Sequence, residues 1–373
     1  MTIVGTRPEL IKLSMVIPAM DQAFNHVLVH TGQNYDFELN EIFFSELNIR
    51  RPDHFLSCAQ ATGLQTIAQV LVKVEELLLV EKPEALLIYG DTNSCYAALC
   101  AKKMGIPVFH MEAGNRCFDD RVPEEINRRV IDHVSDINMP LTEHARRYLL
   151  AEGLPPDRVI KTGSCMFEIL NHYDDQITAS DALSIHGLKK GEYFVLSCHR
   201  EENVDSPTKL QALLTSLDKL TSEFSKTIVF SVHPRTQKRL DALDPKWNSR
   251  KNLMALKPLG FFDYVQLQRQ AFCVLSDSGT LMEESAIVGF PAVHCRDAFE
   301  RPEGMEHGVL VVSSLDPESL CSAVRIVTAP TASASATNAT NPVSDYKIDH
   351  VSKTVVRIIQ SYTPIINRLV WRR

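Results

Sequence analysis

The sequence predicts an α/β protein with parallel β-sheets, divided into two domains. Short apolar runs alternate with segments of helical period along the whole chain, which is the pattern expected when a helix connects each strand to the next. The chain has 373 residues, more than a single hydrophobic core normally serves. Its content of 45% hydrophobic and 23% charged residues is typical of globular proteins.

The composition also argues against several classes of function. A formal net charge of -7 does not favour non-specific binding to nucleic acid, which needs a basic face. The nine cysteines are scattered and form no CxxC pair, so the sequence predicts neither a zinc ribbon nor a disulfide framework. The apolar runs are strand-sized, and the N-terminus lacks the pattern of a signal peptide. We therefore expect a cytoplasmic protein that binds neither nucleic acid nor membranes.

The first series of predicted strands contains two turns that could bind a ligand. The run at 2–4 ends in Gly5 and Arg7 before a helix, where backbone N–H groups and a guanidinium can hold a phosphate. A plain strand-to-helix connection is the more frequent explanation of one such turn. Asp91 follows another buried strand, at the sheet edge where parallel sheets bind ligands. A helix N-cap explains Asp91 equally well. The strands of this series are predicted at 2–4, 27–33, 85–89, 105–109, 137–140 and 159–164, and a core helix at 64–81.

The stretch from His110 to His133 interleaves acids with arginines directly after an apolar run. Pro123 suits the first turn of a helix, and a glutamate next to it lies favourably near the positive end of that helix. We therefore expect Glu112 and Glu124 on opposite sides of one loop. A structural ion-pair network would account for these charges equally well.

The second series of strands follows a domain boundary at 165–190. His199 and His233 come after its first two strands, and Phe261 comes after the third. One such histidine is more often structural, but three strand ends at one sheet edge favour a binding site. Ser278 and Gly279 begin a helix whose free N–H groups suit a phosphate, and Glu284 one turn later can accept from ribose hydroxyls. These strands are predicted at 193–197, 227–232, 253–256, 273–276 and 291–295, followed by a mobile loop at 328–345 and a partly helical end at 348–373.

A set of motifs spans nearly the whole chain: GTRPE at 5–9, GDT at 90–92, HMEAG at 110–114, PEEINR at 123–128, HREEN at 199–203, SDSG at 276–279 with glutamates at 283 and 284, and ERPE at 300–303. Together they resemble the non-hydrolysing UDP-N-acetylglucosamine 2-epimerases. The resemblance implies the GT-B architecture, in which two Rossmann-like domains with parallel sheets face each other across a cleft. It implies an N-terminal domain at 1–170 with the catalytic acids, a UDP-binding domain at 171–350, and a C-terminal helix at 351–373 that returns to the first domain.

The resemblance also implies the reaction. These enzymes invert C2 of a UDP-N-acetylhexosamine by anti elimination of UDP to a 2-acetamidoglycal and re-addition, for precursors of surface polysaccharides. Because a proton leaves one face and returns on the other, at least two proton-transfer groups are needed, and the phosphate charge must be neutralised as UDP departs. By resemblance, the catalytic residues are Asp91, Glu112, Glu124 and His199; the UDP-binding residues are Arg7, His233, Phe261, Tyr264, Ser278, Gly279 and Glu284; and the substrate-adjacent residues are Lys12, Arg128 and Arg301.

The resemblance implies neither a metal nor a nicotinamide cofactor, and no GxGxxG motif is present to bind the latter. We expect a homodimer. Many members continue their second strand with Gln-His-Arg, where substrate binds as an allosteric activator; here Gln33 is followed by Asn34, Tyr35 and Asp36, which puts that regulation in doubt.

Residues 115–119 and 128–139 look more like the branch that acts on UDP-2-acetamido-2,6-dideoxy-L-talose and forms UDP-N-acetyl-L-fucosamine for capsule or O-antigen. The other functions that remain open are a GT-B glycosyltransferase, a hydrolysing epimerase and a non-catalytic UDP-sugar sensor. A glycosyltransferase would retain the configuration at C2 and need an acceptor.

Overall fold

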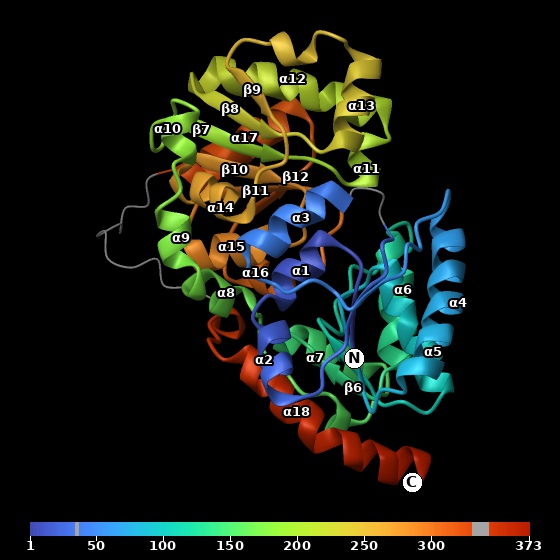
Figure 1. Cartoon of the computed structure of the whole chain (residues 1–373). Helices are drawn as coiled ribbons and strands as arrows, with labels where there is room; N and C mark the ends of the chain where they lie inside the picture. Colours follow the sequence, from blue (N-terminus) through green and yellow to red (C-terminus); the bar gives the residue numbers. More distant parts are fainter. Residues whose placement is uncertain (34–36, 330–342) are drawn as a thin grey trace. The chain divides into compact units, whose positions relative to one another are not determined.

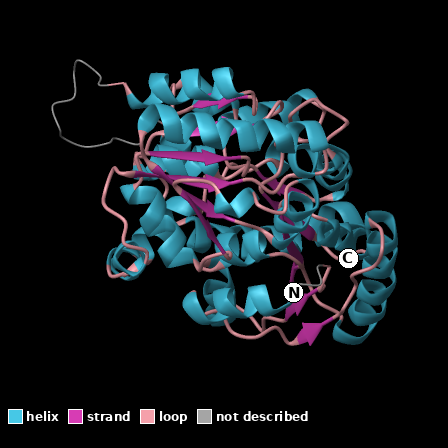
Figure 2. Ribbon diagram, turned by 90° about the horizontal axis from the view of Figure 1, so that it is seen from above, coloured by secondary structure: helices cyan, strands magenta, loops and turns pink. Residues whose placement is uncertain are grey.

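The computed structural model describes residues 1–33, 37–329 and 343–373. The chain divides into two compact units, one formed by Met1–Asn171 with Asp345–Arg373 and the other by His172–Ser344. Each unit contains a six-stranded parallel sheet, and the strands of each sheet lie between helices (Figures 1 and 2). The predicted α/β class with two Rossmann-like domains is therefore confirmed.

The sheet of the first unit has the strand order β3-β2-β1-β4-β5-β6. This is the order found in dinucleotide-binding folds, where ligands lie at the carboxyl ends of the strands. Its central strands are buried from end to end, which explains why they read as continuous apolar runs rather than as alternating patterns. The strands are β1 (Thr2–Val4), β2 (Leu28–His30), β3 (His54–Phe55), β4 (Leu86–Tyr89), β5 (Val108–Met111) and β6 (Ile137–Met139).

The helices of the first unit connect these strands and cover the sheet (Figure 1). Two of them have a proline in the first turn. Helix α1 begins at Arg7 and has Pro8 next, and α6 begins at Pro123 itself, as the sequence predicts. The helices are α1 (Arg7–Leu13), α2 (Val16–Ala23), α3 (Phe37–Glu46), α4 (Gly63–Glu81), α5 (Ala97–Lys103), α6 (Pro123–Val134), α7 (Glu143–Ala151), α8 (Met166–His172) and α18 (Val351–Ile366), with short turns of helix at Asn93–Tyr96, Pro156–Arg158 and Asn367–Trp371.

The second unit has the same topology, with the strand order β12-β11-β10-β7-β8-β9. Read from the other edge, with β7 as its first strand, this order is the same as that of the first sheet. Helices α12 and α17 pack together over one face of this sheet and form an apolar core with it. The strands are β7 (Tyr193–Ser197), β8 (Thr227–Ser231), β9 (Leu253–Leu256), β10 (Cys273–Ser276), β11 (Ala292–Cys295) and β12 (Val311–Ser313). The helices are α9 (Asp174–Thr178), α10 (Ala182–Ile185), α11 (Glu201–Val204), α12 (Pro207–Phe224), α13 (Pro234–Leu243), α14 (Phe261–Gln270), α15 (Leu281–Val288), α16 (Pro302–Glu306) and α17 (Pro317–Thr328), with a turn at Trp247–Ser249 and another at Ser344–Tyr346 near the unit boundary.

Two predictions fall on parts of the chain that are not described. Residues 34–36, which depart from the common Gln-His-Arg pattern, lie outside the described residues. The predicted loop at 328–345 falls mostly on 330–342, which also lie outside them. Within the described ranges, no helix combines the length and apolar character that a membrane crossing requires.

The structure corrects the predicted limits of the strand before the acidic loop. The strand begins at Val108 and continues to Met111, whereas the sequence predicts 105–109. His110 is paired in register with Ile88 of β4 on one side and Asn138 of β6 on the other. His110 is therefore a buried residue of the sheet, and Glu112 is the first residue of the loop.

The prediction of a strand at 159–164 is wrong. Only Val159 forms an isolated bridge, with Asn138 at the sheet edge. Gly163 has a φ of +84°, which lies outside the range of a strand. The backbone turns there, and the next N–H, of Ser164, donates to the carbonyl of Asp345 at 3.2 Å.

The helix predicted at 64–81 is present as α4, but only one of its faces belongs to the core. Val70, Val74 and Leu78 are buried against the sheet, whereas the opposite face remains in contact with solvent. The sequence indicates apolar character but not how much of it is covered, because Leu and Val recur on both faces of this helix.

The C-terminal segment of the chain belongs to the first unit. Helix α18 packs against α2, and Figure 1 shows these two helices side by side, one red and one blue. Its start is held by Glu168 of α8, whose carboxylate accepts the backbone N–H of Ser352 at 2.9 Å and also the Ser352 hydroxyl. Asp345 adds a second link, because it accepts from Lys161 at 2.6 Å and from the N–H of Glu143 at 2.9 Å.

Replacing Glu168 by alanine should destabilise the first unit by about 2–4 kcal/mol, because two hydrogen bonds to a buried carboxylate are lost. Amide hydrogen exchange should become faster along α18, and urea should unfold the protein at a lower concentration. The exposed Glu318 of α17, which pairs with Lys219 at the surface, provides the control. Glu318→Ala should change stability by no more than about 0.5 kcal/mol. Unchanged exchange in α18 of Glu168→Ala would contradict this account.

Candidate functional site

The candidate residues of the first unit lie in the turns after β1, β4 and β5, and Glu9 links two of these turns. Its buried carboxylate accepts the N–H groups of Gly5 at 2.5 Å and Thr6 at 2.7 Å, and the Thr92 hydroxyl at 2.6 Å. Burial raises the pKa of Glu9 to about 7, although these hydrogen bonds oppose the rise. Gly5 is required at this position because a Cβ atom would lie only 1.8 Å from the Ser94 hydroxyl.

The two cationic candidates of this unit both lie on α1. Arg7 is partly exposed at its start, with its guanidinium 5.3 Å from the centre of the Phe43 ring. Lys12 lies one turn later and is buried. These positions place a guanidinium near the start of the helix and an amine inside the unit.

Asp91 is not a helix cap, so that alternative is wrong. Thr92 is the N-cap of the short helix after β4, and its hydroxyl accepts the N–H of Ser94 at 3.3 Å. The Asp91 carboxylate instead accepts from Arg128 Nε at 2.7 Å, and its backbone carbonyl accepts from the Asn127 amide at 2.8 Å. The structure thus brings together two predicted site residues, Asp91 and Arg128, and fixes the carboxylate by a charged hydrogen bond.

Glu112 follows β5 directly and has a φ of +63°, a conformation that residues other than glycine rarely adopt. The hydroxyl of Tyr89 donates to its carboxylate at 2.5 Å. Tyr89 is not among the residues that the sequence predicts for the site. The register could have indicated it, because Tyr89 is paired with Met111, the residue immediately before Glu112.

The two glutamates after Pro123 have different surroundings. Glu125 is fully buried and accepts the N–H groups of Cys117 at 3.0 Å and Phe118 at 3.1 Å, as well as Arg128 Nη1 at 3.1 Å. Burial would raise its pKa, but the Cys117 N–H and the Arg128 charge outweigh burial and hold the pKa below its usual value. Glu124, in the first turn of α6, is only partly buried. The loop therefore contains both a structural ion-pair network and carboxylates with access to solvent.

In the second unit, a buried aspartate that the sequence analysis did not assign organises the turn after β7. Asp277 accepts the N–H groups of His199 at 3.0 Å and Arg200 at 2.9 Å, and the Asn203 amide at 3.1 Å. Its Oδ1 also lies 3.3 Å from Nδ1 of His199. Burial alone would raise the pKa of Asp277. The His199 charge and these hydrogen bonds together outweigh burial, so the pKa of Asp277 lies below its usual value. The signal in the sequence is its position directly after β10, next to Ser278.

The predicted histidines of this unit lie near each other. The ring centres of His199 and His233 are 6.2 Å apart. Nδ1 of His233 accepts the N–H of Arg235 at 3.2 Å, so His233 is also the N-cap of α13. The structural explanation and the ligand-binding explanation are therefore compatible for this residue.

The turn at Gly279 is held by Arg301. Arg301 Nε donates to the Gly279 carbonyl at 3.0 Å, and Nη2 lies 2.6 Å from the buried carboxylate of Glu283. A Cβ atom at position 279 would lie 2.9 Å from the Glu300 carboxylate. A side chain at position 279 would therefore have to displace the Glu300 carboxylate, and the neighbouring Ser278 is partly exposed at the same turn.

Glu284 and the aromatic candidates belong to α15 and α14. The Glu284 carboxylate accepts the Thr280 hydroxyl and the Gln268 amide, each at 2.7 Å. Phe261 and Tyr264 lie in the first turn of α14, the first buried and the second partly exposed. Gln268 of the same helix thus connects the helix that carries the aromatic residues with the helix that carries Glu284.

Two further buried polar residues of this unit were missed. Arg296 is fully buried, with Nε 3.2 Å from Glu202 and Nη1 3.1 Å from Glu300, while Nη2 has no hydrogen-bond partner among the described residues. His294 of β11 is buried, and neither of its ring nitrogens has a hydrogen-bond partner within the described ranges. Burial, followed by the Arg296 charge, lowers the pKa of His294 to about 4.

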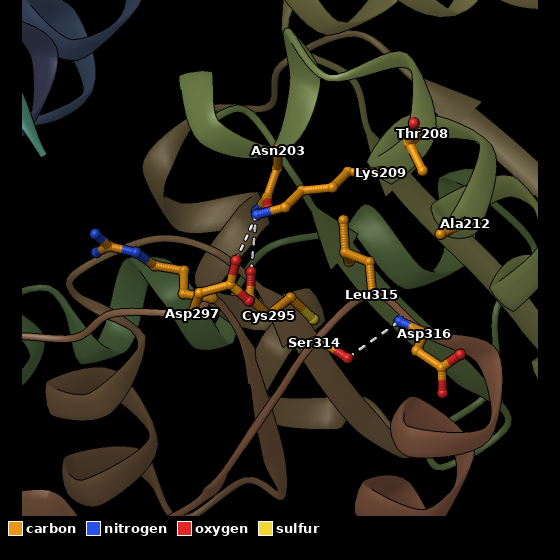
Figure 3. Close-up of a pocket in the computed structure, with 10 residues that line it drawn as sticks. Asn203, Thr208, Lys209, Ala212, Cys295, Asp297, Ser314, Leu315 and Asp316 are labelled. Atoms are coloured by element: carbon orange, nitrogen blue, oxygen red, sulfur yellow. Dashed lines mark hydrogen bonds and ion pairs between the residues drawn. The ribbon is translucent and has the colours of Figure 1, made fainter. Parts of the chain in front are cut away.

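A pocket of about 200 Å³ is lined in part by Asn203, the residue whose amide donates to Asp277 (Figure 3). Asn203 lies on its wall and donates to the Cys295 carbonyl at 2.9 Å, while Lys209 and Asp297 form an ion pair at 2.5 Å. The predicted site residues do not line this pocket. Among the described residues, no group of three or more His, Cys, Asp and Glu side chains is arranged to hold a metal ion.

Comparison with known proteins identifies relatives along almost the whole chain. The family described as UDP-N-acetylglucosamine 2-epimerase matches residues 19–360. The structure of UDP-N-acetylglucosamine 2-epimerase from Rickettsia bellii is 49% identical, with a TM-score of 0.92 over 100% of this chain and 98% of that one. That of the Methanocaldococcus jannaschii UDP-GlcNAc 2-epimerase, in complex with UDP-GlcNAc and UDP, is 34% identical, with a TM-score of 0.88 over 96% and 98%.

A third relative has a different substrate in its name. The UDP-2,3-diacetamido-2,3-dideoxy-D-glucuronate 2-epimerase of Pseudomonas aeruginosa is 35% identical over 84% of this chain and 87% of its own length. The two Rossmann-like units and the matches to solved epimerases agree with the predicted GT-B-like fold. The extent of these matches shows that the chain belongs to the UDP-N-acetylglucosamine 2-epimerase family.

Proposed function

We propose that this chain inverts C2 of UDP-N-acetylglucosamine without hydrolysing it, by elimination and re-addition of UDP. The observation that carries the proposal is the pair of carboxylates at neighbouring strand ends, Asp91 after β4 and Glu112 after β5. Each is held by a charged or very short hydrogen bond, from Arg128 at 2.7 Å and from Tyr89 at 2.5 Å. Acids fixed in this way suit a reaction that removes and replaces a proton at defined positions.

In the proposed reaction the acids of the first unit act on the sugar. One carboxylate removes the C2 proton while the bond between C1 and the phosphate oxygen breaks, which gives UDP and a 2-acetamidoglycal. UDP then adds back to C1, and a proton is delivered to C2 from the opposite face. Asp91, Glu112 and Glu124 are the proton-transfer groups in this proposal, and Lys12 and Arg128 lie adjacent to the substrate.

The second unit holds the nucleotide in this proposal. Ser278 and Gly279 donate to the diphosphate in this proposal, and His199, oriented by the buried Asp277, suits the negative charge that UDP acquires as it departs. In the first unit, the Arg7 guanidinium is suited to a phosphate. In this proposal Glu284 binds the ribose, and Phe261 and Tyr264 lie near the uracil. His233 also binds UDP, and Arg301 lies adjacent to the substrate.

A second UDP-sugar is a candidate substrate. Residues 115–119 and 128–139 resemble the branch that acts on UDP-2-acetamido-2,6-dideoxy-L-talose, and the Pseudomonas aeruginosa relative shows that names within this family differ in the sugar. The chemistry at C2 is the same in each case. Incubation with both UDP-sugars in parallel separates them, since only the true substrate should be epimerised at a useful rate.

Incubation with UDP-N-acetylglucosamine in deuterium oxide should place one deuterium at C2 of the recovered UDP-sugars, because the returning proton comes from a group that exchanges with solvent. NMR and mass spectrometry measure the deuterium, and chromatography measures free UDP. Accumulation of free UDP in proportion to the sugar consumed would indicate hydrolysis instead. If UDP-N-acetylhexosamines bind but none of them incorporates deuterium, the protein is a UDP-sugar sensor. If the sugar is only transferred to an added acceptor, the protein is a glycosyltransferase.

Glu112→Gln and Glu124→Gln should each lower kcat by at least about 100-fold, since a glutamine cannot transfer the proton. The affinity for UDP, measured by calorimetry, should stay within about threefold because these carboxylates act on the sugar. Glu84→Gln is the control, at an exposed position before the start of β4, and it should behave as the unchanged protein. An unaltered kcat in either variant would remove that residue from the reaction.

We also propose that the chain forms a homodimer through the outer face of α4. Leu64, Val72, Leu79 and Val80 are between 50% and 80% exposed, and Leu64, Val72 and Leu79 lie on one side of the helix at helical spacing. An exposed apolar face of this kind is typical of protein interfaces.

Leu79→Glu should convert the dimer to a monomer, because a charge would be buried in the proposed interface. Light scattering coupled to gel filtration gives the mass directly. Ile185→Glu, at a position 72% exposed on α10, is the matched control and should leave the mass unchanged. A monomeric unchanged protein, or a dimeric Leu79→Glu variant, would contradict the proposed interface.

A further inference from the structure

His110 occupies a place in the first unit that the proposed reaction does not use. It lies in β5, its side chain is 1% exposed, and its two ring nitrogens face different elements, the turn after β4 and helix α6. Nε2 donates to the carbonyl of Gly90 at 2.8 Å, and Gly90 immediately precedes Asp91. Nδ1 lies 3.0 Å from Oδ1 of Asp132 on α6. One imidazole is therefore in contact with the turn that carries Asp91 and with a buried carboxylate.

Asp132 extends the contact to the other acid-bearing loop. Its two oxygens lie 3.3 and 3.1 Å from the N–H of Gly114, which donates to them. Gly114 is two residues beyond Glu112. Gly114 has a φ of +83°, and a Cβ atom there would lie 2.5 Å from the Ala145 carbonyl oxygen. The loop after Glu112 is therefore tightly packed, and its backbone is anchored on Asp132.

We propose that His110 is a positioning residue that holds Asp91 and Glu112 in one fixed arrangement, acting on Asp91 through Gly90 and on Glu112 through Asp132 and Gly114. The inference rests on the proposed function of the two acids. Neither acid would keep its place through its own side chain alone, because each is attached to a turn whose backbone must also be held. Placement errors of about 1 Å at reacting groups cost roughly 10²-fold in rate.

Nε2 carries a proton, because it donates to the Gly90 carbonyl. Nδ1 lies 3.0 Å from Oδ1 of Asp132 but forms no hydrogen bond among the described residues. Burial lowers the pKa of His110, but Asp132 and the Gly90 carbonyl outweigh burial and raise the pKa above its usual value. Asp91 contributes in the same direction. The imidazolium is thus the form that the surrounding groups stabilise.

The charge is balanced by a chain of partners that leads to the surface. Arg116 Nη1 donates to Asp132 at 2.7 Å, and its other nitrogens bind Glu152 in a bidentate pair at 2.8 Å each. Glu152 reaches the half-exposed His133 at 3.1 Å. Asp132 therefore retains one cationic partner when His110 is replaced by a neutral residue, which makes such variants compatible with folding.

Two substitutions separate the two contacts of His110. The amide nitrogen of glutamine can take the place of Nε2, so His110→Gln keeps the contact with Gly90 and loses that with Asp132. Asparagine can take the place of Nδ1, so His110→Asn keeps Asp132 and loses Gly90. Each variant should lower kcat by about 10- to 1,000-fold, with KM and the affinity for UDP within about threefold, because the acids move while the nucleotide contacts remain.

His26 provides a matched control within the same unit. Its side chain is also 1% exposed, and its ring nitrogens contact the Asp21 carboxylate at 2.6 Å and the Thr2 hydroxyl at 2.8 Å. It precedes β2, at the amino end of the strands and not at the end that carries the acids. His26→Gln and His26→Asn should reduce stability but leave kcat per folded molecule unchanged.

The experiment measures kcat, KM, UDP affinity and the folded fraction of all four variants, with circular dichroism for the last. Lower kcat in both His110 variants with unchanged KM supports the proposal. Wild-type kcat in both, or losses that only follow the folded fraction, would overturn it. Asp132→Asn, which keeps the shape of the side chain, is the second variant if a His110 variant folds poorly, and it should show the same split between kcat and KM. Inactivity of the unchanged protein would instead count against the proposed function.

Discussion

Glu9, Glu125, Asp132 and Asp277 share one physical constraint, which is that a carboxylate buried in a protein must have its oxygens satisfied. Each of the four accepts backbone N–H groups from a loop at the carboxyl end of a parallel strand. A loop held through its own backbone cannot drift, so the side chains next to these N–H groups have defined positions. The candidate site depends on these contacts more than on direct contacts between the reacting groups.

The same contacts make the pH dependence of stability differ from loop to loop. The pKa of Asp277 and that of Glu125 are lowered in the folded state, so their contributions are present above the pKa of the unfolded chain and are lost as the pH falls. The pKa of Glu9 is raised from 4.5 to about 7. Ionisation of Glu9 therefore opposes folding, and stability decreases as the pH rises from about 4.5 to about 7. The raised pKa of His110 acts in the same direction, because its stabilisation is lost at high pH.

The sequence predicts the strands and helices well where the signal is local. The buried runs of β4 and β7 and the proline at the start of α6 were predicted from composition and position alone. The strand at 159–164 failed because Gly163 turns the backbone, and Asp91 was not a cap because Thr92 took that place. Tyr89 and His110 could not be assigned roles, because their partners are set by strand register and tertiary packing, which one sequence does not specify.

Glu124 and Glu125 show where the limit of sequence reasoning lies. They are adjacent, identical in chemistry and both in the first turn of α6, so neither propensity nor charge distinguishes them. A helix turns by roughly 100° per residue, which directs one side chain inward and leaves the other partly exposed. Glu125 faces the N–H groups of the preceding loop and becomes part of the scaffold, whereas Glu124 is partly exposed. The scaffold role of Glu125 is therefore what leaves Glu124, and not Glu125, as the candidate for chemistry.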